Sequence, residues 1–233
     1  MACGYRSTPL ARVCWHGNST GQALEVWARS VNTAGAWGSG RAISTGAVYV
    51  FGQLAVAAHA GGGGAVLWSQ RTLPATPMVM EAAVYSTSTG WQAASTISQD
   101  GTDDCYAPQV AFDAAGNALA VWQQQSNYSS CGASNRHVAG AGWSGATYFV
   151  DSKAGDAFAP ALAMDAAGNA TAVWFRWSTT NSIDLMINRY TAAGGWLGAQ
   201  VFAPLGVSAT MVRSVPEVVS NARGQALVVW ALR

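Results

Sequence analysis

The feature that most constrains the fold of this chain is an internal repeat. Residues 108–122, with the sequence PQVAFDAAGNALAVW, recur with few changes at residues 160–174. Weaker copies occupy residues 54–68 and 216–230, and a degraded copy occupies residues 1–15. Each copy ends in a tryptophan, and successive copies lie about 53 residues apart. A repeat of this length indicates an array of similar units that bury their apolar faces against one another.

Each repeat is expected to contain two β-hairpins. In the first hairpin, alternating apolar residues lead into Asp113-Ala114-Ala115-Gly116-Asn117, and a strand containing Val121 and Trp122 follows. Asp and Gly favour short turns, because Gly accepts a positive φ and Asp bonds to the turn backbone. Asp113 and its counterpart Asp165 are therefore predicted to be structural. The second hairpin ends in a small residue and a tryptophan, at Trp37, Trp91, Trp143 and Trp196.

Four short antiparallel strands per repeat predict an all-β protein, a β-propeller with four-stranded blades in a single domain over residues 1–233. Only 10% of the residues are charged, which suits blades that bury both faces. A β-sandwich and a linear solenoid are the less favoured alternatives. The repeated tryptophans are expected to pack between blades.

The number of blades is left open by the count of hairpins, which is five first hairpins and four second hairpins. We expect five blades, of which the last is incomplete. The first hairpin, in residues 1–22, is expected to be degenerate. In the alternative, the C-terminal hairpin joins the N-terminal second hairpin and closes a four-bladed ring. A third alternative is a fragment of a longer array, and exposed blade edges would then favour homo-oligomers.

The repeat resembles those of poorly characterised bacterial secreted and envelope β-propeller proteins. The resemblance rests on the Asp-Ala-Ala-Gly-Asn turn before Ala-Val-Trp, and on Ile187-Asn188-Arg189-Tyr190 before Gly-Gly-Trp. It covers residues 50–233 well and the first 22 residues poorly. It implies the fold and a secreted, periplasmic or envelope location, although no signal peptide is visible at Met1, and it implies no particular reaction. The turn differs in spacing from sialidase Asp-boxes, so no sialidase residue is carried over.

The four cysteines bear on the compartment. Cys105 precedes the first strand of one repeat and Cys131 follows its second strand, so a Cys105–Cys131 disulfide is predicted, as an exported protein would favour. A Cys3–Cys14 bridge is less favoured, and the alternative is four reduced thiols. No spacing of Cys and His indicates zinc.

The candidate site lies in the loops that enter the first strands, where scarce carboxylates gather. Asp104 and Asp156 are equivalent, each four residues before its repeat proline, and Asp100, Asp103 and Asp151 lie beside them. With Glu217, Asp104 and Asp156 are the candidate catalytic residues of a glycosidase. The candidate ligand-binding residues are polar groups at the axis mouth and aromatic rings that suit sugar stacking: Gln109, Arg213, Trp27, Trp177 and Tyr128. The favoured alternative is that these aspartates only cap turns and solvate loops.

We therefore expect a lectin-like protein that binds a glycan or an envelope component. A hydrolase and a purely structural repeat fragment are the alternatives, and His59 or His137 could act as a general base. No cofactor is expected, although Asp-rich loops could hold calcium. The net charge of +1 argues against nucleic acid as a partner, and no apolar run approaches 18 residues, so no transmembrane segment is expected.

Overall fold

The computed structural model describes residues 11–16, 25–32, 34–44, 49–71, 77–99, 103–125, 129–149, 156–177, 182–207 and 214–232. These residues form β-strands, turns and loops, and they contain no helix. The all-β prediction is therefore confirmed for the part of the chain that is described.

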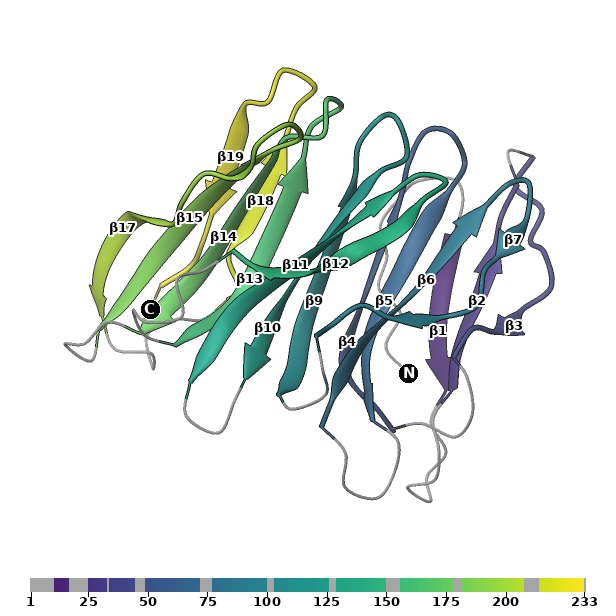
Figure 1. Ribbon diagram of the computed structural model, residues 1–233, viewed down its shortest axis with the longest axis horizontal. Helices are drawn as coiled ribbons and strands as arrows, with labels where there is room; N and C mark the ends of the chain where they lie inside the picture. The colour runs from purple at the N-terminus through teal and green to yellow at the C-terminus, as the bar shows by residue number, and fades with distance from the viewer. Residues whose placement is uncertain are drawn as a thin grey trace.

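The described strands form five antiparallel sheets (Figure 1). The first contains β1 (Ala11–His16), β2 (Glu25–Ser30) and β3 (Arg41–Ala42). The second contains β4 (Tyr49–Ala58), β5 (Gly64–Arg71), β6 (Val79–Ser86), β7 (Gly90–Trp91) and β8 (Ser95–Thr96). The third contains β9 (Asp104–Phe112), β10 (Ala118–Gln125), β11 (Ser130–Val138) and β12 (Gly142–Tyr148). The fourth contains β13 (Ala157–Met164), β14 (Ala170–Trp177), β15 (Ile183–Thr191), β16 (Gly195–Trp196) and β17 (Gln200–Val207), and the fifth contains β18 (Glu217–Ser220) and β19 (Ala226–Val229).

The strand order confirms two hairpins per repeat. In the third sheet the order is β12-β11-β10-β9, so each strand pairs with the strand before it in the chain. In the second and fourth sheets the fourth strand is split into two pieces, because β6 pairs with both β7 and β8 and β15 pairs with both β16 and β17. Each complete repeat is therefore one meandering sheet.

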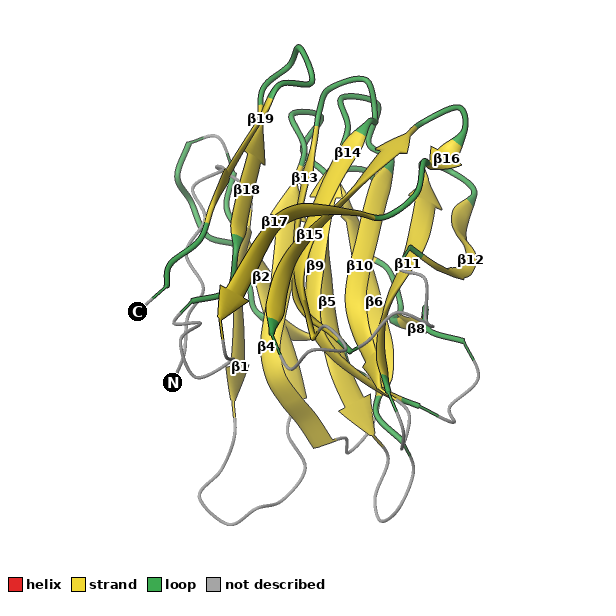
Figure 2. Cartoon of the chain, turned by 90° about the vertical axis from the view of Figure 1, so that its left-hand side faces the viewer, coloured by secondary structure: helices red, strands yellow, loops and turns green. Residues whose placement is uncertain are grey.

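The sheets stack face to face in a row. Figure 2 looks along this row, with the strands of successive sheets one behind another. Successive side chains of a strand point to opposite faces, so Trp122 of β10 packs toward the second sheet while Val121 packs toward the fourth. Trp68, Trp122 and Trp174 are at most 1% exposed. The predicted packing role of these three tryptophans is therefore confirmed, and each contributes roughly 2–3 kcal/mol through its burial.

The turn between the first and second strands is built around one side chain that accepts backbone N–H groups. Asp165 Oδ1 accepts hydrogen bonds from the N–H groups of Ala167 and Asn169, both at 2.9 Å. Asp165 Oδ2 accepts one from Asn169 Nδ2 at 3.0 Å. Asp113 makes the same three kinds of bond in its own turn. The prediction that both aspartates are structural is confirmed.

Neighbouring turns also contact one another along the upper edge of the row as drawn in Figure 1. Ala114 N–H donates to the carbonyl oxygen of Ala166 in the next turn, at 3.1 Å. A Cβ atom on Gly168 would lie 3.0 Å from Asp113 Oδ2. Glycine is therefore required at position 168 for two reasons. Its φ is +85°, and the carboxylate of Asp113 in the preceding sheet lies against it.

Two buried asparagines join the third strand of a sheet to the end of the preceding repeat. Asn135 Nδ2 donates to the carbonyl oxygen of Ile97, and Asn188 Nδ2 donates to that of Phe149, both at 2.8 Å. Asn135 and Asn188 are equivalent and at most 3% exposed. A buried amide is stable only when it is bonded, so these contacts fix the spacing of consecutive sheets.

The alternative of a four-bladed ring, in which the C-terminal hairpin joins the N-terminal second hairpin, is wrong. The C-terminal hairpin, β18–β19, forms its own sheet and packs on the fourth sheet through Val218 and Val228. The N-terminal β2 pairs instead with β1 and β3. The first and fifth sheets lie at opposite ends of the described row (Figure 1), so no closed ring is formed by these residues.

Candidate functional site

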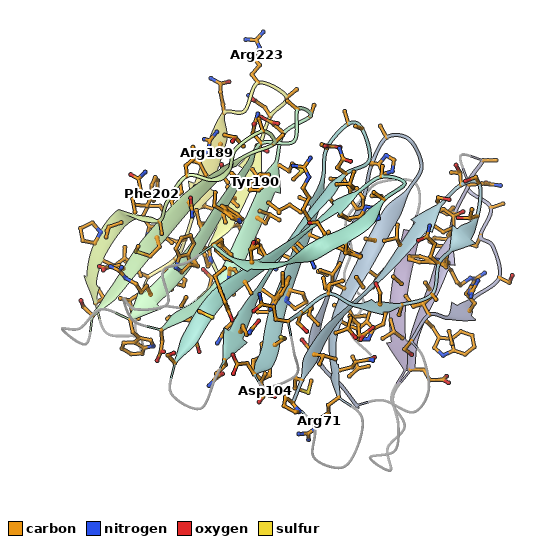
Figure 3. All side chains as sticks on the ribbon, in the orientation of Figure 1. Arg71, Asp104, Arg189, Tyr190, Phe202 and Arg223 are labelled. Carbon is orange, nitrogen blue, oxygen red and sulfur yellow. The ribbon has the colours of Figure 1, made fainter. Side chains whose placement is uncertain are left out.

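The candidate site lies along the lower edge of the row in Figure 3, where second strands end and first strands begin. Asp104 opens β9 at this edge, and its two carboxylate oxygens have different partners. Oδ1 accepts a hydrogen bond from Met78 N–H of the preceding sheet at 2.7 Å, and Oδ2 accepts one from the hydroxyl of Tyr106 at 3.0 Å. Burial and the hydrogen bond to Asp104 raise the pKa of Tyr106, which the positive charge of Arg71 partly offsets.

Gln124 organises a second group at the same edge. Its Nε2 atom donates to Asp103 Oδ2 and to the hydroxyl oxygen of Tyr148, both at 3.2 Å. Its Oε1 atom accepts a hydrogen bond from the repeat tryptophan, Trp122. The ring of Tyr148 is 46% exposed. A buried amide therefore holds an exposed aromatic ring beside a carboxylate.

Asp156 and Trp177 supply the corresponding edge of the fourth sheet. Asp156 Oδ1 accepts a hydrogen bond from Ser130 N–H of the preceding sheet at 2.7 Å, as Asp104 does from Met78. The carbonyl oxygen of Asp156 accepts one from Trp177 N–H at 2.9 Å. Trp177 also packs against Phe158, with ring centroids 6.4 Å apart. The equivalence of Asp104 and Asp156 is thus structural as well as sequential: each carboxylate ties its sheet to the one before.

The remaining predicted polar residues are dispersed. Glu217 begins β18 directly opposite Val229, on the exposed face of the fifth sheet. It aligns with Gln109, which lies opposite Val121, five residues along β9 from Asp104. The structure therefore does not group Glu217 with Asp104 and Asp156 in the lower edge. Arg213, Tyr128, Asp100 and Asp151 lie outside the described residues.

Trp27 occupies the third-strand position of the first sheet. It lies opposite Ala42 as Met186 lies opposite Val201, so Trp27 corresponds to Met186 of β15. The bridge between Val31 and Trp37 repeats the pairing of Tyr190 with Trp196 and supports the same correspondence. Trp27 is 41% exposed on the outer side of the first sheet, and its Nε1 donates to Glu25 Oε2 at 2.9 Å.

Two residues of the edge were not singled out from the sequence, namely Arg71 and Tyr148. Arg71 lies three residues after Trp68, as Trp177 lies three residues after Trp174. That shared spacing could have indicated Arg71 as a residue at the end of a second strand. No comparable signal points to Tyr148, because it reaches the edge through Gln124.

The predicted Cys105–Cys131 disulfide is wrong, since both residues are free thiols. Cys105 of β9 and Cys131 of β11 both lie opposite Gln124, on either side of β10. Two strand spacings separate their backbones by about 10 Å, beyond the roughly 7 Å that a disulfide can span. The alternative Cys3–Cys14 pairing lies outside the described side chains.

The other chemical candidates lie away from the carboxylates. His59 and His137 are both at the upper edge: His59 Nδ1 accepts a hydrogen bond from Gly61 N–H in a turn, and His137 lies opposite Ala118. Burial lowers the pKa of His137. Among the described residues, no three His, Cys, Asp or Glu side chains are grouped as metal ligands. The same residues include no helix long and apolar enough to cross a membrane.

The sequence matches no family model and no curated protein sequence. Solved structures share its fold at low identity. A Dyadobacter fermentans DSM 18053 protein of unknown function matches with a TM-score of 0.56 and 9% identity, over 90% of this chain and 64% of the other. The Hadza microbial sialidase Hz136 matches with a TM-score of 0.51 and 12% identity, over 94% of this chain and 50% of the sialidase. The chain thus spans between half and two thirds of the length of both proteins.

Proposed function

We propose that this chain is part of a β-propeller that binds carbohydrate along its lower edge. The observation that carries the proposal is the alternation there of aromatic rings with polar groups on neighbouring sheets. The rings belong to Tyr148 and Trp177, and the polar groups to Arg71, Asp103, Asp104 and Asp156. The propeller assignment is supported by the stacked four-stranded sheets and by the shared fold with much longer chains.

The chemistry of the edge suits sugars. Tyr and Trp offer a flat apolar face with a polar rim, against which the C–H groups of a sugar ring pack. Carboxylates accept hydrogen bonds from sugar hydroxyls, and such charged bonds are stronger than neutral ones. Because Asp104 and Gln124 are already held by neighbouring backbone or side chains, little further ordering is needed when a ligand binds.

Binding is favoured over hydrolysis by the placement of the carboxylates. Asp104 and Asp156 belong to adjacent sheets, which pack about 10 Å apart. A retaining glycosidase needs its two carboxyl groups about 5 Å apart, whereas an inverting one uses roughly 6.5–9.5 Å. The third predicted carboxylate, Glu217, lies on another face. The second candidate function is therefore hydrolysis with inversion, with Asp104 and Asp156 as the two carboxylates.

The test is a glycan array followed by titration calorimetry on the whole chain. Trp177→Ala should weaken binding of the selected glycan at least tenfold, and Asp104→Asn should weaken it while keeping the oxygen that bonds Met78. Trp27→Ala is the matched control, since it removes an exposed tryptophan elsewhere. Each variant is first checked for an unchanged urea unfolding midpoint.

Several outcomes would overturn the proposal. One is an array on which no glycan is retained, and another is binding that Trp27→Ala removes and Trp177→Ala spares. Turnover of chromogenic glycosides that Asp156→Asn abolishes would replace binding by hydrolysis. Export of the protein remains a sequence prediction, and the free Cys105 and Cys131 give it no support.

A further inference from the structure

The fifth sheet exposes an apolar face at one end of the row. Val219 is 54% exposed, Leu227 66% and Val229 52%. Their strand neighbours Val218 and Val228 point the opposite way, into the contact with the fourth sheet. Val219 lies opposite Leu227, and Glu217 lies opposite Val229. These four outward residues, Glu217, Val219, Leu227 and Val229, are named here the last outer face.

The first sheet exposes a different face at the other end. Along β2, Val26 and Ala28 are buried against the second sheet, while Glu25, Trp27 and Arg29 point outward. Trp37 is 41% exposed beside them, with the Arg29 guanidinium carbon 5.8 Å from its ring centroid. Glu25, Trp27, Arg29 and Trp37 are named here the first outer face.

The two outer faces carry the two halves of the interface that repeats inside the row. Between the third and fourth sheets, Val121 of β10 packs in one cluster with Met186 of β15. Val229 corresponds to Val121 by its position in the repeat. Trp27 corresponds to Met186, because Trp27 lies opposite Ala42 as Met186 lies opposite Val201. The last outer face thus presents the second-strand half of the repeating contact, and the first outer face presents its third-strand half.

The two outer faces also carry one pair of opposite charges. Glu217 supplies a carboxylate on the last outer face, and Arg29 supplies a guanidinium on the first. The carboxylate of Glu25, also on the first outer face, accepts a hydrogen bond from Trp27 Nε1. The two faces cannot meet within one copy as described, because they lie at opposite ends of the row (Figure 1). Exposed apolar sheet faces of this kind mark association sites.

We infer that the last outer face of one copy docks on the first outer face of a second copy, which continues the stack of sheets head to tail. Such a contact is heterologous, since different surfaces of the two copies meet, and it gives either a ring or an open chain of copies. The inference does not depend on carbohydrate binding, which is placed along the lower edge.

The experiment blocks each face separately and then mixes the two variants. Leu227→Glu disables the last outer face and Trp27→Glu disables the first, and the mass of each species is measured by light scattering at about 100 µM. The control is Leu197→Glu, whose side chain is 65% exposed, close to the 66% of Leu227, but belongs to neither face. The urea midpoint of every variant establishes that it is folded.

We expect the wild-type chain and Leu197→Glu to form dimers or larger species, and each blocked variant to be monomeric. An equimolar mixture of the blocked variants should form a one-to-one dimer and nothing larger, because one intact pair of faces remains. A monomeric wild-type chain would overturn the inference. So would a Trp27→Glu variant that still dimerises, because the contact would then join like faces, and so would blocked variants that fail to combine.

Discussion

Asp165 and Gly224 lie against each other across the boundary between the fourth and fifth sheets: a Cβ atom on Gly224 would come 2.9 Å from Asp165 Oδ2. The same relationship joins Asp113 to Gly168. One side chain therefore closes its own turn and also sets how closely the next turn can approach. The lower edge has an equivalent device in Asp104 and Asp156, which bond the backbone of the preceding sheet.

The first prediction concerns Gly224, whose φ is +76°. Gly224→Ala should lower the free energy of unfolding by about 2–3 kcal/mol, because it combines backbone strain with a clash against Asp165. The control is Gly195→Ala, where φ is +75° and no atom lies within 4 Å of the added carbon. That variant should lose only about 1 kcal/mol, the cost of strain. Equal losses in urea denaturation would show that the carboxylate contact is unimportant.

The second prediction concerns the carboxylate of Asp165. Asp165→Ala leaves two turn N–H groups and an amide without their acceptor, so it should cost about 1–3 kcal/mol. Asp165→Asn keeps an oxygen at the Oδ1 position and should cost less. Urea midpoints compare the two, and a variant with Asn no better than Ala would contradict the role assigned to Oδ1.

The ionisation of Asp165 should also make the stability of the fold depend on pH. Burial opposes its ionisation, but hydrogen bonds from Asn169 and Ala167 and the nearby charge of Arg189 outweigh burial and lower its pKa. A carboxyl whose pKa is lower in the fold than in the unfolded chain stabilises the fold above its unfolded value of 3.8. That contribution should disappear as the pH falls through the folded pKa. Asp165→Asn should therefore reduce the loss of stability below about pH 4, measured by urea midpoints at a series of pH values.

The third prediction concerns Glu81, which is 5% exposed on β6. Burial raises its pKa, and the hydrogen bond from Thr96 Oγ1, at 2.5 Å, partly offsets this. A carboxyl with a raised pKa favours the fold when protonated, so its contribution is lost as the pH rises through the folded pKa. Glu81→Gln should therefore raise the urea midpoint at pH 8 and have little effect at pH 4. The control is Glu217→Gln, which removes a carboxylate from an exposed position.

The fourth prediction concerns the two free thiols. Burial raises the pKa of Cys105 to about 12 and that of Cys131 to about 11. Because the thiolate is the reactive form, both should be alkylated slowly by iodoacetamide at pH 8 and rapidly in 6 M guanidinium. Peptide mass spectrometry without reductant should find no link between them. A linked peptide from the folded chain would contradict the strand arrangement around Gln124.

The sequence by itself determined the repeating hairpin. Tryptophan spacing, the Asp-to-Asn turn and alternating small and apolar residues are local signals, so they predicted the strands of the third and fourth sheets and the structural role of Asp113 and Asp165. They also placed Asp104 and Asp156 at equivalent ends of neighbouring sheets.

Only the tertiary structure decided which side chains meet across sheets. Cys105 and Cys131 are each one strand from Gln124 and thus too far apart to bridge, which depends on strand order and not on spacing along the chain. Glu217 and Trp27 face outward because they belong to the end sheets, whereas their counterparts Ala161 and Met186 are buried within the row. Whether a side chain is buried depends on whether another sheet packs against its face of the strand. The local sequence around the residue does not contain that information.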